Sequence, residues 1–202
     1  MIAIIDYGAG NIFSVKNALD HLCIQSVLTS DKAVIEAADK IILPGVGAFR
    51  AAMDMLKERD LVGILKEQAK KKSFLGICLG MQLMFEKSYE FGETEGLGLL
   101  KGYVDRIDEP DFVIPHMGWN KLVFSQDCPL FEGLYESYVY FVHSYKAFCE
   151  DKDLYAYCEY GHRVPAVVGD GKYLYGCQFH PEKSGFDGLK ILENFSELSV
   201  EE

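Results

Sequence analysis

Cys78 lies between two glycines in the segment 76–80 (GICLG), and this spacing can support nucleophilic chemistry. An apolar run over 74–77 precedes the cysteine, and a helical pattern with one apolar face follows it. The pattern predicts a strand that turns sharply into a helix, which is the geometry of a nucleophile elbow with sulfur in place of oxygen. Small residues at both flanks relieve the crowding of such a turn. The helix N-terminus favours the thiolate form of the cysteine.

A cysteine nucleophile requires a base within reach and a group that orients the base. His180 and Glu182 can supply both, because they stand two residues apart after the β-like run 173–179. On a continuing strand, residues i and i+2 project from the same face, so the carboxylate can lie beside the imidazole. The sequence therefore predicts a Cys78–His180–Glu182 triad. Taken singly, a buried core cysteine and a strand-end histidine remain the alternatives.

A glycine-rich loop, Gly45-Val46-Gly47, follows the expected strand 40–43 and Pro44. Backbone N–H groups in such a loop can point at an anion, because glycine allows close approach and positive φ. Thiolate attack on a carbonyl develops charge on oxygen, so we expect this loop and the N–H of Leu79 to form an oxyanion hole. An ordinary glycine turn is the alternative. A second glycine pair, at 8 and 10, lacks the third glycine of a dinucleotide-binding loop.

The elements that must position these residues alternate between strand and helix in the first half of the chain. The expected strands cover 2–5, 26–29 and 40–43, and the expected helices cover 11–22, 48–57 and 61–71. This order predicts a doubly wound α/β fold with a mostly parallel sheet, whose ligands gather at the carboxyl ends of the strands.

The second half is β-rich, and a final helix is expected over 186–198. Its expected strands cover 138–142, 154–160, 166–168 and 173–179. No low-complexity linker or internal repeat divides the chain, so we expect a single domain over residues 1–202.

Composition and charge exclude several classes of function. The net charge of −11 argues against nucleic acid or an anionic membrane as the main partner. No apolar stretch approaches the roughly 20 residues that span a bilayer, and Met1 leads directly into an expected strand rather than a signal peptide. The six cysteines form no C-x-x-C pair. We therefore expect no metal and no cofactor, and reduced thiols in the cytoplasm.

Several motifs resemble those of the class I, triad-type glutamine amidotransferases. The resemblance rests on the elbow, on the loop 44–47 and on His180-Pro181-Glu182. More narrowly, four segments resemble the glutaminase subunits of imidazole glycerol phosphate synthases: DYGAGN (6–11), PHMGWN (115–120), FVHSY (141–145) and QFHPEKS (178–184). The motifs extend over nearly the whole chain, and 115–120 is the most specific of them.

The resemblance implies a single glutamine amidotransferase domain with defined roles for its residues. Cys78 would be the nucleophile, His180 the general base and acid, and Glu182 the orienting carboxylate. L-Glutamine would be held by Gln82 and Glu90, and its α-amino and α-carboxylate end would be lined by His143, Ser144 and Tyr145. Asn11 and Trp119 match positions at a subunit interface. From the residues alone, Trp119 could equally be a core anchor and His143 a core histidine, and no partner for His116 is evident.

The resemblance also implies an activity and a partner. The chain would hydrolyse glutamine to glutamate and ammonia within a heterodimer. A (β/α)8-barrel cyclase/synthase subunit would take the ammonia and make imidazole glycerol phosphate and the aminoimidazole carboxamide ribotide AICAR in histidine biosynthesis. Three alternatives stay open: a glutaminase of this type that feeds a different synthase, for example in sugar amidation; a stand-alone cysteine hydrolase; and a catalytically idle interaction protein.

Overall fold

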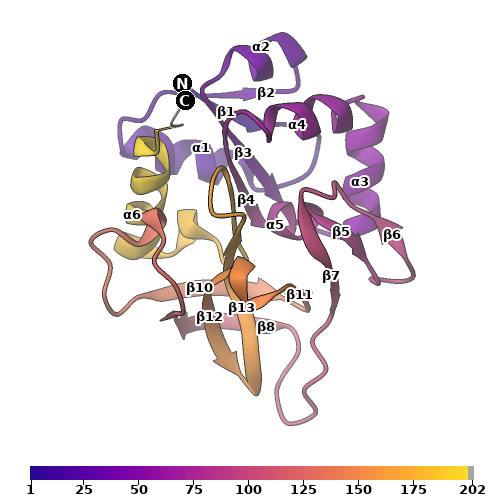
Figure 1. Ribbon diagram of the computed structural model, residues 1–202, viewed down its shortest axis with the longest axis vertical. Coiled ribbons are helices and arrows are strands. Elements are labelled where there is room, and N and C mark those ends of the chain that lie inside the picture. The colour runs from indigo at the N-terminus through magenta and orange to yellow at the C-terminus, as the bar shows by residue number, and fades with distance from the viewer. Residues whose placement is uncertain (200–202) are drawn as a thin grey trace.

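A central eight-stranded sheet organises the computed structural model, which describes residues 1–199 (Figure 1). Five neighbouring strands run parallel, in the order β2 (Ser26–Thr29), β1 (Ile2–Ile5), β3 (Lys40–Gly45), β4 (Ser73–Cys78) and β14 (Leu174–Cys177). Three antiparallel strands extend the sheet beyond β14: β13 (His162–Gly169), β12 (Leu154–Tyr160) and β9 (Val123–Phe124). The mostly parallel sheet is therefore confirmed, and a strand from the β-rich half completes its parallel part.

Helices cover both faces of this sheet, because the side chains of its buried strands alternate between two apolar clusters. Leu75 and Ile77 of β4 pack in one cluster with α1 (Ile12–His21) and α6 (Gly185–Glu197). Phe74 packs in the other cluster. That cluster includes α2 (Lys32–Ala37), α3 (Phe49–Glu58), α4 (Val62–Gln68) and α5 (Leu79–Leu83). Figure 1 shows α1 and α6 on the opposite side of the sheet from α3 and α4, so the doubly wound fold is confirmed.

Two smaller sheets accompany the central one, and the first of them lies toward the lower end of the view in Figure 1. One is the antiparallel pair β8 (His116–Lys121) and β10 (Tyr138–His143). The other has the order β11 (Tyr145–Phe148), β7 (Leu100–Arg106), β5 (Phe85–Ser88) and β6 (Thr94–Glu95). Short 3-10 helices cover Pro129–Phe131, Asp151–Asp153 and Pro181–Lys183. The single domain stays a prediction, and its residues 200–202 lie outside the described part of the chain. No helix within residues 1–199 is long and apolar enough to cross a membrane.

Several local expectations differ from the structure, and strands β5, β6, β7, β8, β9 and β11 were not expected at all. The helix α2 was not expected, although Asp31 caps its N-terminus through a bond from the Ala33 N–H to its carboxylate (2.8 Å). The helix after the elbow was expected to have one apolar face, but α5 has five residues and all of them are buried. A helix that is buried all round carries no amphipathic pattern, so its length could not be predicted from periodicity.

Candidate active site

Three neighbouring strands place the expected oxyanion loop, nucleophile and base at one edge of the sheet. Strand β4 ends at Cys78, and Gly45 at the end of β3 stands opposite it in the parallel register. Strand β14 lies on the other side of β4 and ends at Cys177, three residues before His180. Carboxyl ends of parallel strands form the ligand-binding edge of open α/β sheets.

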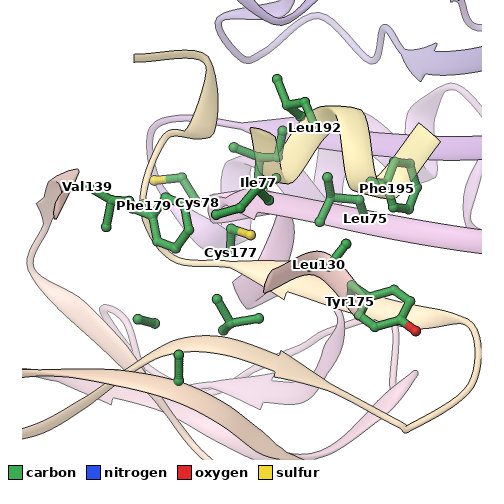
Figure 2. Close-up of a cluster of buried hydrophobic side chains, with 14 of the residues drawn as sticks. Leu75, Ile77, Cys78, Leu130, Val139, Tyr175, Cys177, Phe179, Leu192 and Phe195 are labelled. Atoms are coloured by element: carbon green, nitrogen blue, oxygen red, sulfur yellow. The ribbon is translucent and has the colours of Figure 1, made fainter. Parts of the chain in front are cut away.

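Cys78 occupies a strained turn that its glycine neighbours make possible. Its φ of +54° and ψ of −112° are rarely adopted by residues other than glycine. A Cβ on Gly80 would lie 1.8 Å from the carbonyl oxygen of Leu43, and a Cβ on Gly76 would lie 2.7 Å from the Met81 nitrogen. The elbow is thus packed directly against strand β3 and its own helix. Figure 2 shows Cys78 at the end of its strand beside Phe179, with Leu75 and Ile77 further along the same strand.

His180 and Glu182 form a buried pair. The distance from His180 Nδ1 to Glu182 Oε1 is 2.8 Å, and the two side chains are 2% and 1% exposed. The expected strand geometry is wrong, because β14 ends at Cys177 and Glu182 lies in the 3-10 helix Pro181–Lys183. A tight turn, rather than the alternation of a strand, brings the carboxylate to the ring.

Ser184 anchors this turn from its far end. Its hydroxyl donates to the carbonyl oxygen of His180 (2.6 Å) and accepts from the N–H of Tyr140 on β10 (3.0 Å). The N–H of His180 also donates to the carbonyl of Tyr140 (3.0 Å). The position of the imidazole therefore depends on hydrogen bonds to a neighbouring sheet.

The charge state of His180 follows from its neighbours. Burial lowers the pKa of the ring, but the Cys78 sulfur and the Glu182 carboxylate outweigh this effect and raise that pKa to about 9. Since Nδ1 faces Glu182, the other nitrogen, Nε2, is the one available to the sulfur; it is buried and has no hydrogen-bond partner among residues 1–199. An imidazolium in this place stabilises a thiolate.

A cavity of about 230 Å³ joins most of the expected site residues. Cys78 and His180 lie on its wall together with Val46, Gly47, Leu79, Gln82, Glu90, Val142, His143, Ser144 and Tyr145. Gly45 and Glu182 do not line it; they stand beside Cys78 and His180 respectively. A larger hollow of about 680 Å³ near Pro129 and Tyr173 contains neither cysteine nor histidine. The smaller cavity is therefore the candidate active site.

Gln82 and Glu90 present acceptor groups to this cavity. Gln82 Nε2 donates to the carbonyl of Tyr145 (3.0 Å) and to Gln178 Oε1 (2.9 Å). Both of its N–H groups are thereby used, and its oxygen is left for the cavity. Glu90 Oε2 accepts from the N–H of Phe49 at the start of α3 (2.6 Å), where the helix dipole favours a carboxylate.

Sequence reasoning assigned no role to two further residues beside the sulfur. Gln178 is fully buried, and its Nε2 lies 3.9 Å from Cys78 Sγ. Tyr7 is also fully buried, its hydroxyl has no partner in the described part of the chain, and burial and the Cys78 sulfur raise its pKa. Both residues belong to motifs quoted above, but nothing local in the sequence places either of them at the nucleophile.

Asn11 and Trp119 lie outside the cavity. Asn11 directly precedes α1, and its Oδ1 accepts from the Ser14 hydroxyl (2.7 Å). Trp119 on β8 is 57% exposed, so the alternative of a core anchor is wrong. Among residues 1–199, no group of three or more His, Cys, Asp or Glu residues could hold a metal ion.

The chain belongs to the class I glutamine amidotransferase family, whose model matches residues 3–198. It is 52% identical over 197 residues to the imidazole glycerol phosphate synthase subunit HisH of Bacillus cereus (strain AH187), covering 96% of this chain and 93% of that one. The HisH subunit of Oceanobacillus iheyensis is 51% identical over 201 residues, covering 98% and 99%. The family is thereby established, and the chain is a glutamine amidotransferase.

Solved structures of low identity share the fold. A glutamine amidotransferase crystal structure matches with a TM-score of 0.75 at 19% identity, covering 96% of this chain and 99% of that one. The structure of PurLQS from Thermotoga maritima matches with a TM-score of 0.73 at 20% identity, covering 96% of each chain.

Proposed function

We propose that this chain is the glutaminase subunit of an imidazole glycerol phosphate synthase, acting as one domain over residues 1–202 in the cytoplasm. The observation that carries the proposal is the cavity in which Cys78 and His180 meet the acceptor groups of Gln82 and Glu90. Relatives that are 52% identical over nearly the whole chain are subunits of that synthase. The pathway served is histidine biosynthesis.

The chemistry follows from the order of the groups around the sulfur. The Cys78 thiolate attacks the side-chain amide carbon of glutamine, and the N–H of Leu79 with the loop Gly45-Val46-Gly47 receives the oxyanion. His180, oriented by Glu182, gives its proton to the departing ammonia and leaves a glutamyl thioester. Water activated by His180 then releases glutamate and regenerates the thiolate.

The substrate is recognised at its amino-acid end. The free oxygen of Gln82 and the carboxylate of Glu90 are both acceptors, so they suit the α-ammonium group of glutamine. The segment His143-Ser144-Tyr145 lines the same cavity and offers backbone groups to the α-carboxylate. The side-chain amide of glutamine then extends toward Cys78.

The partner is a (β/α)8-barrel cyclase subunit that docks on the exposed face of the β8–β10 sheet. Met117 and Trp119 on β8, and Tyr138 on β10, are large apolar side chains exposed on this face. Val142 pairs with Met117 in the register and also lines the cavity. The proposed docking face therefore reaches the rim of the active site, where ammonia leaves. Asn11 lies before α1, near the exposed Phe13.

The proposal is tested by mixing the full chain with the cyclase subunit of an imidazole glycerol phosphate synthase, the cyclase's nucleotide ligand and glutamine labelled with 15N in the side-chain amide. We expect glutamate release to accelerate in the complex and the label to enter the imidazole product, with AICAR as the second product. Equal hydrolysis with and without the cyclase would favour a stand-alone hydrolase. Label appearing only in a different acceptor would identify another synthase.

A further inference from the structure

A chain of hydrogen bonds runs along the buried face of the β8–β10 sheet. His143 Nδ1 lies 2.8 Å from the carbonyl oxygen of Tyr145, and His143 Nε2 lies 3.0 Å from His116 Nδ1. The other nitrogen of His116, Nε2, lies 3.4 Å from Asn120 Nδ2. Asn120 is held in turn by the carbonyl of Glu159, which accepts from its Nδ2 (3.0 Å). Both imidazoles are buried.

The direction of this chain follows from its two ends. A carbonyl oxygen only accepts, so His143 carries its proton on Nδ1 and offers Nε2 as an acceptor. His116 must therefore donate from Nδ1, which leaves its Nε2 to accept from the Asn120 amide. Burial lowers the pKa of His143 to about 3 and that of His116 to about 4, in agreement with two neutral rings. Each histidine is thus held in one tautomer.

A second branch leaves the same carbonyl and ends at the nucleophile. The Tyr145 carbonyl also accepts from Gln82 Nε2, and Gln82 Nε2 donates to Gln178 Oε1 as well. The amide nitrogen of Gln178 faces Cys78 Sγ. Because its oxygen is occupied, Gln178 can offer only an N–H to the sulfur, which suits a thiolate.

We propose that His116 and Gln178 are positioning residues, joined through His143, Tyr145 and Gln82 in one hydrogen-bond chain from strand β8 to the sulfur of Cys78. This role rests on the proposed glutaminase function. The His116 branch holds the pocket wall at 143–145 in place. The Gln178 branch fixes the Gln82 amide, so that its oxygen and not its nitrogen meets the substrate.

The chain also connects the pocket to the proposed docking face. Trp119 points to the outer face of β8, whereas its neighbours His116 and Asn120 take part in the inner network. A partner that moves β8 by contacting Trp119 would move His116 as well. Docking of the partner subunit could in this way change the geometry of the glutamine pocket.

The outer branch is tested with two variants of His116 in the full chain bound to the cyclase. His116→Phe keeps the ring that stacks on Phe141 and Tyr160 (centroid distances 4.7 and 4.0 Å) but removes the donor to His143. His116→Asn keeps an N–H near the position of Nδ1. We expect His116→Phe to raise the KM for glutamine about tenfold with a smaller change in kcat, and His116→Asn to recover part of the loss.

A matched control is His162→Phe. His162 is a half-buried histidine in the same half of the protein; it pairs with Glu109 and takes no part in the hydrogen-bond chain. We expect its KM to stay at the wild-type value. The 15N NMR spectrum of histidine-labelled full chain supplies a readout independent of activity: the His143 Nε2 resonance should shift in His116→Phe and stay in His162→Phe. An unchanged His143 spectrum with an unchanged KM would overturn the proposal. A wild-type complex that fails to hydrolyse glutamine would instead overturn the proposed glutaminase function. The NMR result would still test the hydrogen-bond chain.

The inner branch is tested with Gln178→Met, which keeps side-chain length and removes both hydrogen-bonding groups. We expect slower alkylation of Cys78 by iodoacetamide and a KM for glutamine raised about tenfold, since the Gln82 amide is no longer fixed. The shift of the thermal midpoint relative to wild type is measured alongside, so that a folding defect is separated from an effect on the site. Alkylation and KM both within twofold of wild type in a folded variant would remove Gln178 from the chain.

Discussion

In the N-terminal half, Cys78 is positioned by close packing, whereas in the C-terminal half His180 is positioned by hydrogen bonds. The elbow fits against β3 only because Gly80 has no side chain, and the contact is backbone to backbone. The imidazole depends on Glu182, on Ser184 and on the backbone of Tyr140. A site held by packing tolerates the removal of side-chain atoms but not their addition. A site held by hydrogen bonds is damaged most when a buried partner is removed.

The largest effect is expected from Cys78→Ala. Glutamine hydrolysis in the complex should fall by at least roughly four orders of magnitude, because the thioester can no longer form. The variant should still fold cooperatively, since the elbow loses one atom and gains none. Calorimetry and a glutamate assay provide the two readouts.

A thiol-alkylating glutamine analogue should label Cys78 and spare the other five cysteines. Burial raises the pKa of three of these thiols to about 12 and that of a fourth well above its usual value: Cys128, Cys149, Cys158 and Cys177. The label is located by mass spectrometry. Label on Cys177 or on the exposed Cys23 in place of Cys78 would contradict the assignment of the nucleophile.

Gly80→Ala tests positioning by packing. The new Cβ would meet the Leu43 carbonyl oxygen at 1.8 Å, so strand and elbow must separate. We expect a loss of about 3 kcal/mol or more in the free energy of unfolding, together with the loss of activity. Gly63→Ala in α4 is the matched control, because its Cβ would meet no atom within 4 Å. That change should be neutral or stabilising by up to about 1 kcal/mol, as measured by urea unfolding.

Glu182→Gln tests positioning by hydrogen bonds. An amide in place of the carboxylate allows His180 to adopt the wrong tautomer or orientation, so kcat should fall by roughly three orders of magnitude. His180→Asn should lower kcat further. Steady-state kinetics of both variants in the complex separates the two costs. Full activity of Glu182→Gln would reduce the triad to a Cys78–His180 dyad.

The pH dependence of stability tests the charge on His180. Its pKa is raised to about 9 in the folded protein, so the folded state holds a proton that the unfolded chain releases near pH 6.5. This contribution, up to about 3 kcal/mol, is complete below about pH 6.5 and is lost as the pH rises through 9. Cys78→Ala removes one source of the shift and should flatten the dependence. Unfolding curves between pH 6 and 10 give the free energy of unfolding as a function of pH. Equal slopes for wild type and Cys78→Ala would mean that the proton is not held by the His180–Cys78 pair.

The smallest of these effects is expected at the docking face. Trp119→Ala should weaken binding of the cyclase by about 2 kcal/mol, because an aromatic side chain that becomes buried at an interface often dominates its binding energy. The triad and the thermal midpoint of the isolated chain should not change, since Trp119 is 57% exposed. Titration calorimetry with the cyclase measures the loss. Unchanged affinity would move the interface away from β8.

The elbow and the first parallel strands could be predicted from the sequence because they are local. Gly76, Cys78 and Gly80 specify a turn within five residues, and the buried strands β1, β3 and β4 are continuous apolar runs. The motif at 178–184 likewise marked His180 and Glu182 as a pair. Its geometry was predicted wrongly, because the end of a strand depends on the neighbours that it meets.

The sequence by itself determined the chemistry: a cysteine at a strand-to-helix turn, a histidine and a carboxylate two residues apart, and a glycine loop for an oxyanion. Only the tertiary structure decided which side chains share the cavity and how their protons are arranged. His116 and His143 are 27 residues apart in sequence, and Gln82 and Gln178 are 96 apart. The first pair forms because β8 and β10 pair in one sheet, and the second because β14 lies beside β4. The direction of a hydrogen bond follows from the groups that surround it in space, and those are set by packing over the whole chain.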